Sequence, residues 1–303
     1  MFICFGDIVL FMAKPKLSYN PDDISETTYL KISKSSFVLY NMCPRKYWWN
    51  YIALPDVRPP ASEAMLRGSA IHKAMEPLII APTDPKMIKL GDKSAIKQGF
   101  GADIGYGVMK ELLADLESKI GKWEMLQAEI KITIHDERKG VYLVGAMDGL
   151  LRAENGDIIL VELKTGNFND GKLSRTRREL AFYTYMLEHT EYPRPTHFLY
   201  IAPDATNEKM LNKLSGQKKK TVGFGLVQGM YVLEPISLRT INSFMKVYDR
   251  TVDLLKEQKF PFKWNDYFCT QYCDYVVQCE PEMMGLCEDP TLDDISLGNI
   301  VSE

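Results

Sequence analysis

The stretch from Val144 to Gly166 holds two apolar runs joined by a polar turn, and this pattern predicts a β-hairpin. Two apolar runs flank a polar turn in which Asn155-Gly156 is the tight-turn signal. The first apolar run ends at Asp148, and the second carries Glu162 and Lys164. Because successive side chains of a strand alternate between faces, Glu162 and Lys164 are expected on the same face. Two carboxylates and a lysine within an apolar sheet need a cation, a partner or a catalytic role.

Helical patterns dominate the chain before this hairpin. Ser33 to Ser36 offer N-cap residues for a helix that runs up to Cys43-Pro44, and a second helix is expected over residues 62–80. Gly68 and His72 lie four positions apart in that second helix and so share one face. Residues 93–120 are expected to be helical, and Met125 to Ile134 alternate as a strand that contains Glu129.

Strands and helices continue to alternate after the hairpin. A basic stretch leads into a helix that ends near His189, and Thr196 to Ala202 reads as a buried strand. Residues 203–221 are polar and are expected to form an exposed loop, followed by a strand over 222–233 and a long helix over 235–258. Alternation of this kind predicts an α/β protein with a central mixed sheet flanked by helices.

The pattern divides the chain into consecutive segments. The expected ranges are 1–32 for an N-terminal lead-in, 33–122 for a helical segment, 123–258 for the sheet-containing core, 259–287 for a cysteine-rich segment and 288–303 for a polar tail.

Composition is that of a globular chain without bulk basicity. The 303 residues are 46% hydrophobic and 25% charged, with a net charge of −3, so any nucleic-acid binding would need a local basic patch. The apolar opening is interrupted by Asp7 and is too short to span a bilayer, so we expect neither a targeting nor a transmembrane segment and no membrane partner. The expected location is the cytoplasm, or the host cytoplasm if the protein is viral.

Four of the six cysteines lie close together near the C-terminus, at Cys269, Cys273, Cys279 and Cys287. In a reducing compartment, clustered cysteines are more often metal ligands than disulfides. A structural zinc site and an iron–sulfur cluster are both consistent with the spacing.

Two segments could contact nucleic acid. The ten residues from Cys43 to Ile52 combine basic side chains with four aromatics, which fits either a base-stacking surface or a packed helix with its aromatics in the core. Lys172 to Arg178 hold four cations in seven residues, which fits either a phosphate-binding surface or a solvated helix face.

Six short motifs occur along the chain in this order: Cys43-Pro-Arg-Lys-Tyr, Arg67-Gly68-x-x-Ile71-His72, Gly145-x-x-Asp148, Glu162-x-Lys164-Thr-Gly, Glu179-Leu-x-x-Tyr183 and Cys273-Asp-Tyr-x3-Cys279 with Cys269 before it. The motifs and their order resemble the RecB-type branch of the PD-(D/E)XK nuclease superfamily. Within that branch the chain most resembles the iron–sulfur members, which include CRISPR-associated four-cysteine exonucleases, the AddAB nuclease domain and eukaryotic exonuclease V. The resemblance spans residues 33 to 279 and implies a restriction-endonuclease-like core with a helical extension.

The resemblance implies metal-assisted hydrolysis of phosphodiester bonds. Asp148 and Glu162 would hold Mg²⁺ or Mn²⁺ through oxygen ligands, with His72 as a further ligand. Lys164 would orient or help to deprotonate the attacking water and would offset charge that develops on the phosphate.

The resemblance also implies a [4Fe–4S] cluster that staples the two ends of the chain. Its ligands would be Cys43, Cys269, Cys273 and Cys279, with zinc as the less favoured occupant. Three residues separate Cys269 from Cys273 where the family has two, so Cys287 could substitute for one ligand. Cys4 is expected not to be a ligand.

DNA contacts are expected in the motifs that flank the site. The family has glutamine where this chain has Glu179, which would add negative charge near a phosphate path unless Glu179 binds metal or pairs with a neighbouring arginine. The residues expected to contact DNA are Arg45, Lys46, Arg177, Arg178, Glu179 and Tyr183.

The sequence therefore predicts a metal-dependent deoxyribonuclease, an exonuclease acting on single-stranded or frayed DNA ends. Since no helicase motif is present, an unwinding, recombination or CRISPR-adaptation partner would be another chain. Two alternatives stay open: a nuclease-fold DNA-binding subunit with little catalysis, and a zinc-stapled structural or regulatory protein.

Overall fold

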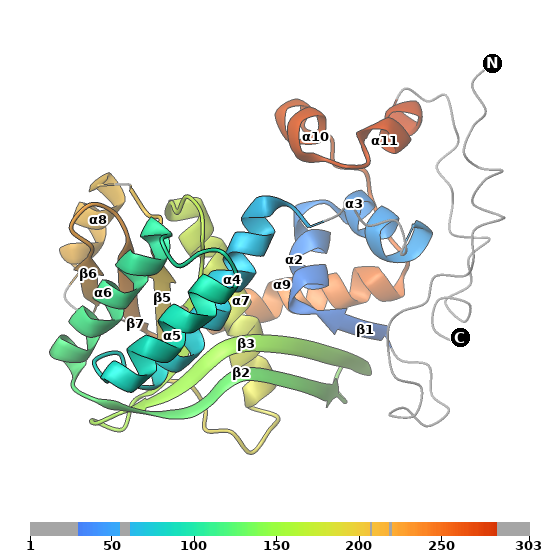
Figure 1. Cartoon of the computed structure of the whole chain (residues 1–303). Helices are drawn as coiled ribbons and strands as arrows, with labels where there is room; N and C mark the ends of the chain where they lie inside the picture. The colour runs from blue at the N-terminus through green and yellow to red at the C-terminus, as the bar shows by residue number, and fades with distance from the viewer. Residues whose placement is uncertain (1–29, 55–60, 207, 218–219, 284–303) are drawn as a thin grey trace. The chain divides into compact units, whose positions relative to one another are not determined.

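The computed structural model describes residues 30–54, 61–206, 208–217 and 220–283 (Figure 1). The candidate ligands Cys4 and Cys287 and the expected polar tail lie outside these residues. The chain forms two compact units: unit 1 comprises Met1–Pro60, Thr133–Val144 and Met245–Glu303, and unit 2 comprises Ala61–Ile132 and Gly145–Phe244. In the described part, no helix is both long enough and apolar enough to cross a bilayer.

Unit 2 is built on a mixed sheet with the central strand β4 buried along its whole length. β4 is antiparallel to β3 and parallel to β5, while β5 and β6 are both antiparallel to β7. β2 pairs with β3, and both strands continue into unit 1. The strands are β2 (Trp123–Asp136), β3 (Val141–Ala153), β4 (Ile158–Leu163), β5 (His197–Ala202), β6 (Thr221–Phe224) and β7 (Met230–Pro235).

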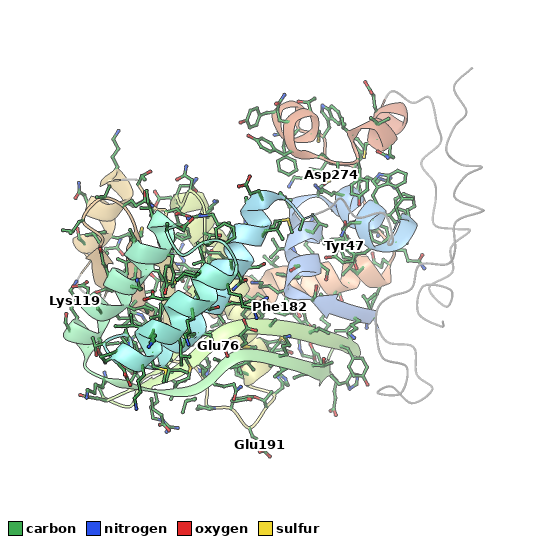
Figure 2. All side chains as sticks on the ribbon, viewed as in Figure 1. Tyr47, Glu76, Lys119, Phe182, Glu191 and Asp274 are labelled. Atoms are coloured by element: carbon green, nitrogen blue, oxygen red, sulfur yellow. The ribbon has the colours of Figure 1, made fainter. Side chains whose placement is uncertain are left out.

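The helices of unit 2 cover this sheet. Alternate residues of β4, Ile159, Val161 and Leu163, pack with α4, α5 and α6 in one hydrophobic core, while α7 contacts β4 as well. Phe182 of α7 is fully buried, whereas Lys119 and Glu191 are exposed and point outward (Figure 2). The helices are α4 (Glu63–Ile80), α5 (Pro85–Lys97), α6 (Ile104–Ile120), α7 (Asp170–Leu187), α8 (Glu208–Ser215) and α9 (Leu238–Lys256), the last of which continues into unit 1.

The expected α/β fold with a mixed sheet flanked by helices is confirmed, and so is the hairpin. Gly149 of β3 pairs with Val161 of β4, and the turn between the strands contains Gly156 at φ 87°. Only glycine adopts that backbone region without strain, which is why Asn-Gly was a sound turn signal.

Three expectations about elements were wrong. Residues 93–120 form parts of two helices, because the chain turns at Gly99 with φ 82° between α5 and α6. The expected loop over 203–221 contains the amphipathic helix α8. The expected strand over 222–233 is two strands, β6 and β7, joined by a turn that begins at Gly225 and closes with a hydrogen bond from its N–H to Gly229.

Unit 1 contains a parallel pair of strands and short helices. β1 (Leu30–Ser33) runs parallel to β3, with Ser33 opposite Val144. Ser33 then forms a capping box with Ser36 that begins α2 (Lys34–Met42). The remaining elements of this unit are α3 (Pro44–Trp48), the π-helical turn η2 (Trp49–Ala53), α10 (Asp266–Tyr272) and α11 (Val276–Met283).

The aromatic side chains after Cys43 belong to the core of unit 1. Tyr47, Trp48 and Trp49 are each at most 4% exposed. Tyr47 stacks on Phe260 at 5.9 Å between ring centroids, and Trp49 stacks on Tyr275 at 6.4 Å. Of the two interpretations of this segment, the packed helix therefore describes these three aromatics.

β2 contains a bulge at Glu129. This residue has φ 45°, in the left-handed region that side chains other than glycine rarely adopt. Trp123 and Met125 pack against the core before the bulge, whereas Ile130 and Ile134 are the buried positions after it. The inward-facing positions shift from odd to even numbers, as expected where one extra residue is inserted into a strand.

We expect Glu129→Gly to stabilise unit 2. Removing the Cβ relieves a left-handed strain of about 1–2 kcal/mol, and the greater freedom of glycine in the unfolded chain offsets about 0.5–1 kcal/mol of that gain. Lys131→Gly is the matched control, because Lys131 is equally exposed on the same strand without a positive φ. Urea unfolding should show a higher midpoint for Glu129→Gly and a lower one for Lys131→Gly, and two equal decreases would contradict the strain argument.

Candidate active site

Asp148 and Glu162 lie on paired strands at one end of the hairpin. Asp148 on β3 accepts a hydrogen bond from the backbone N–H of Leu163 on β4 through Oδ2, at 2.7 Å. Glu162 is the neighbour of Leu163, and its side chain is 3% exposed against 17% for Asp148. The hairpin thus brings two carboxylates together in a mostly buried position.

Lys164 joins this pair from the loop after β4. Its Nζ lies 2.6 Å from Oε1 of Glu162 and 2.7 Å from Oε2 of Glu179 on α7. β4 ends at Leu163, so strand alternation does not place Lys164, although Lys164 and Glu162 do meet as expected. Glu179 was expected to bind a metal or to pair with Arg177 or Arg178, and the structure adds Lys164 as a partner.

His72 of α4 completes the group. Its Nδ1 lies 3.2 Å from Oδ1 of Asp148. Burial, the largest single influence, lowers the pKa of His72, but the hydrogen bond to Asp148 and the charges of Asp148 and Glu162 outweigh it, so the pKa is raised. A Cβ at position 68 would meet Oγ1 of Thr165 at 3.0 Å, so Gly68 permits α4 to approach the loop that follows Lys164.

The donor set fits a hard divalent cation in its chemistry. Asp148 and Glu162 offer carboxylate oxygens, which Mg²⁺ and Mn²⁺ prefer, and His72 offers an imidazole nitrogen. In this arrangement the side chains contact one another: Asp148 faces His72, and Glu162 faces Lys164. Among the described residues, no three His, Cys, Asp or Glu side chains converge as a metal site would.

Tyr183 supports the site from α7 and is itself buried. Its hydroxyl donates to the backbone carbonyl of Ala146 on β3. Burial and the charges of Glu162 and Asp148 raise the pKa of Tyr183. A Cβ at Gly145 would lie 3.0 Å from the Tyr183 ring, so glycine allows α7 and β3 to pack closely. With 1% of its surface exposed, Tyr183 holds β3 in place and offers little surface for the expected DNA contact.

The two arginines of α7 have different surroundings. Arg177 forms a two-pronged ion pair with buried Glu234 at 2.5 and 2.7 Å, and Tyr200 donates to the same carboxylate. Arg178 is exposed on the surface of α7. Arg178 therefore has the accessibility that a phosphate contact needs, whereas Arg177 is engaged inside the fold.

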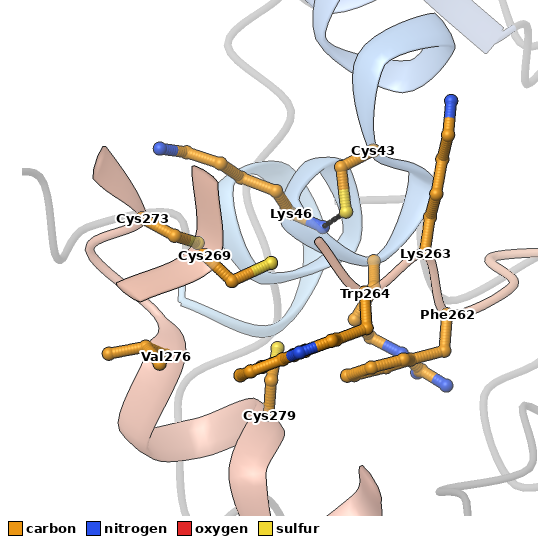
Figure 3. A pocket seen from close by; sticks show the side chains of 10 residues that line it. Cys43, Lys46, Phe262, Lys263, Trp264, Cys269, Cys273, Val276 and Cys279 are labelled. Atoms are coloured by element: carbon orange, nitrogen blue, oxygen red, sulfur yellow. Dashed lines mark hydrogen bonds between the residues drawn. The ribbon is translucent and has the colours of Figure 1, made fainter. Parts of the chain in front are cut away.

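In unit 1, the four cysteines of the described part line one pocket (Figure 3). Cys43 lies between α2 and α3, and Cys269, Cys273 and Cys279 lie in or beside α10 and α11. The chain thus brings together thiols that are more than two hundred residues apart in sequence.

Two of the thiols in this pocket accept hydrogen bonds from the backbone. The backbone N–H groups of Lys46 and Asn265 each lie 3.4 Å from a sulfur, those of Cys43 and Cys269 respectively. Burial raises the pKa of the Cys273 thiol, and neighbouring cysteines raise it further. Four thiols are a donor set that zinc and iron–sulfur clusters both take. In the described part of the chain, however, these side chains do not converge as the ligands of a metal would.

The basic residues after Cys43 turn toward this pocket. Arg45 is 3% exposed and lies over the Trp48 ring at 5.4 Å. Lys46 pairs with Asp274 at 3.1 Å and is 14% exposed. Both line the cysteine pocket, so their observed contacts are with unit 1 itself.

The sequence did not predict a cluster of charged side chains beside the loop that follows β4. Arg67 binds Asp103 and Asp204, and Asp204 also accepts from the backbone N–H of Gly166. The sequence showed Arg67 within a motif but gave no partner, because Asp103 and Asp204 come from distant turns. The only local signal was an aspartate ahead of a helix, which marks Asp103 as an N-cap.

A family model and solved structures match the chain. One solved structure that matches, described as the crystal structure of SSO0001, has 15% sequence identity and a TM-score of 0.36, covering 85% of this chain and 89% of that chain. No functionally curated protein matches. The model of the PD-(D/E)XK nuclease superfamily matches residues 31–280, which is most of the chain. The chain belongs to the PD-(D/E)XK nuclease superfamily.

Proposed function

We propose that the protein is a metal-dependent deoxyribonuclease that digests single-stranded or frayed DNA from an end. Membership of the superfamily implies a nuclease and a nucleic-acid substrate. The observation that carries the proposal is the meeting of Asp148, Glu162 and Lys164, which come from β3, β4 and the loop after β4. The preference for DNA ends rests on the resemblance to iron–sulfur exonucleases.

Each residue of the site has a separate role in this proposal. Asp148 and Glu162 hold Mg²⁺ or Mn²⁺, with His72 as a further ligand, and the bound cation supplies polarisation of the scissile phosphate and a more acidic water. Lys164 orients the attacking water and offsets negative charge that develops on the phosphate. Glu179 holds the Lys164 ammonium from the side of α7, at 2.7 Å.

The glutamate in place of the family's glutamine then has a physical reason. A glutamine at position 179 could accept a hydrogen bond from the Lys164 ammonium but could not form an ion pair with it, whereas Glu179 does both. The Lys164 ammonium offsets the added negative charge, which reduces repulsion of a phosphate. Glu179 therefore acts in the proposal by fixing Lys164 and not by contacting DNA.

The second part of the proposal is a structural [4Fe–4S] cluster held by Cys43, Cys269, Cys273 and Cys279, with Cys287 as a substitute ligand. The four described cysteines line one pocket in unit 1. Such a cluster closes a loop of more than two hundred residues, which carries a large closure entropy in the unfolded chain. In this proposal the protein works in the cytoplasm beside a separate helicase, recombination or CRISPR-adaptation chain.

The experiment that tests the function is digestion of end-labelled DNA by anaerobically purified protein. We expect labelled single strands to shorten progressively in Mg²⁺ or Mn²⁺ and to stay intact in EDTA, with duplex ends digested more slowly. Iron and sulfide are measured on the same preparation. A gel shift without cleavage in any divalent metal would instead identify a DNA-binding subunit, and zinc without iron or DNA binding would identify a structural protein.

A further inference from the structure

Arg67 on α4 forms hydrogen-bonded ion pairs with two carboxylates of unit 2. Its Nε and Nη2 donate to Asp103 at 2.7 and 2.8 Å, and its Nη1 and Nη2 donate to Asp204 at 2.7 and 2.9 Å. An arginine near a nuclease site would ordinarily be read as a phosphate ligand. Here four donor contacts are already directed to carboxylates, so the guanidinium is engaged within the fold.

Glycine neighbours make this arrangement fit. A Cβ at Gly105 would lie 2.5 Å from Nη2 of Arg67 and 2.7 Å from Oδ1 of Asp204. The hydrogen bonds to Arg67 lower the pKa of Asp103, and for Asp204 the bonds to Arg67 and Gly166 outweigh the opposing effect of burial and lower its pKa too. Both carboxylates are therefore ionised at neutral pH and pair with a permanent cation.

The two carboxylates differ in what else they hold. Asp103 accepts from the backbone N–H of Tyr106 at 3.1 Å and so caps α6. Asp204 accepts from the backbone N–H of Gly166 at 2.6 Å. Each carboxylate thus binds Arg67 in two places and also accepts from the backbone. Asp103 has a second backbone bond, from Gly105, and Asp204 accepts from the side chain of Gln228 at 3.5 Å. Only Asp204 reaches the loop that carries Lys164.

That loop is tied to the end of β5 at two points. The Lys164 N–H donates to the carbonyl of Ile201 at 2.8 Å. The Gly166 N–H donates to the carboxylate of Asp204, which lies three residues after Ile201. Gly166 has φ 78°, a conformation that favours glycine, and it ends the segment that begins at Lys164. The position of Lys164 therefore depends on where Asp204 is fixed, and Arg67 fixes Asp204.

We propose that Arg67 and Asp204 are positioning residues that set the loop Lys164–Gly166 for cleavage, whereas Asp103 shares Arg67 but serves as the cap of α6. The kinetic part of this inference rests on the proposed nuclease function. A displacement of about 1 Å at a catalytic group costs about 10²-fold in rate. Arg67 acts through Asp204 and the loop and touches neither substrate nor metal.

The test compares Asp204→Ala with Asp103→Ala, because each variant removes one Arg67 ion pair and two further hydrogen bonds: those of Asp103 with Tyr106 and Gly105, and those of Asp204 with Gly166 and Gln228. Both variants should lose comparable thermal stability. We expect kcat to fall about 10²-fold in Asp204→Ala at unchanged KM, and to stay within about threefold of wild type in Asp103→Ala. Equal losses of kcat in the two variants would show a general structural role and overturn the proposal.

A second readout does not depend on nuclease activity. Hydrogen exchange measured on the peptide that contains Lys164–Gly166 should be at least about tenfold faster in Asp204→Ala and unchanged in Asp103→Ala. If the wild-type protein does not cleave DNA, the proposed function is refuted. The comparison of exchange rates would still show whether Asp204 positions the loop. Equal exchange in both variants, or a loosened loop with undiminished kcat, would overturn the inference.

Arg67 itself is tested by two substitutions. Arg67→Ala should resemble Asp204→Ala in both readouts, and Arg67→Lys should restore little, since one ammonium cannot bind two carboxylates in four places. Asparagine variants at positions 103 and 204 keep a backbone acceptor and replace the alanine pair if either alanine variant fails to fold. Full kcat in a folded Arg67→Ala protein would contradict the proposal.

Discussion

Asp148→Asn is expected to lower the rate of single-stranded DNA digestion in Mn²⁺ by about 10³-fold while leaving the protein folded. The loss follows because a metal-bound phosphate gains several kcal/mol of charge stabilisation, and each 1.36 kcal/mol is tenfold in rate. Asparagine keeps a carbonyl oxygen that can accept from Leu163, now bonded to Asp148 at 2.7 Å, so the contact between β3 and β4 survives.

The measurement is a time course on end-labelled DNA with thermal unfolding of the same samples. Asp170→Asn is the matched control, because Asp170 lies in the first turn of α7 with 61% of its side chain exposed and pairs only with a surface lysine among the contacts observed for it. We expect this control to cleave at the wild-type rate. Lys164→Met should lose about 10²–10³-fold through the missing charge on the phosphate. Undiminished cleavage by both Asp148→Asn and Lys164→Met would refute the assignment of the site.

The hairpin could be predicted because its information is local. Two apolar runs of strand length and the Asn-Gly turn between them specify both strands and their pairing, and so they bring Asp148 next to the strand of Glu162. The meeting of Glu162 and Lys164 was also predicted, but for an incomplete reason. Lys164 lies beyond the strand, and its place depends on Ile201 and Glu179, which are distant in sequence.

Errors in the elements have local physical causes. The apolar spacing of α5 and α6 continues across the turn at Gly99, so periodicity alone merged two helices. The polar composition of 203–221 suggested a loop, although the apolar positions of α8 recur at helical spacing. At the first place, Gly99 is the residue that decides the boundary between the helices, because glycine favours the turn that separates them.

Contacts between distant segments were beyond the sequence. The resemblance named Arg67-Gly68 as a motif, yet only the structure shows that Asp204 joins Arg67 to Gly166. Likewise, the sequence does not show whether a basic side chain faces solvent or pairs with a carboxylate. Arg177, which was expected to contact DNA, pairs with Glu234. Burial and pairing of charges depend on the tertiary fold, which no local pattern records.

Cys43→Ser is expected to remove iron from the protein and to lower the stability of unit 1 by about 5 kcal/mol. The figure of about 5 kcal/mol is the free energy that a cross-link gains by closing a loop of more than 100 residues. It applies to Cys43 because, among the described cysteines, Cys43 is the one that comes before the C-terminal group and so closes the loop. Serine keeps the size of the side chain and can still accept from the N–H of Lys46, so loss of the N-cap of α3 contributes little.

Iron, sulfide and thermal unfolding measured on anaerobic preparations separate the candidates for the occupant. Cys4→Ser is the control, since Cys4 is expected not to be a ligand and its change should leave iron at the wild-type level. Cys269→Ser should retain part of the iron, because Cys287 can take its place as a ligand. Wild-type protein that holds zinc in place of iron would refute the iron–sulfur cluster. A Cys43→Ser protein with unchanged metal content and unchanged unfolding would refute it too, because a cluster bound by cysteines from both ends of the chain cannot lose its N-terminal ligand without releasing the loop that it closes.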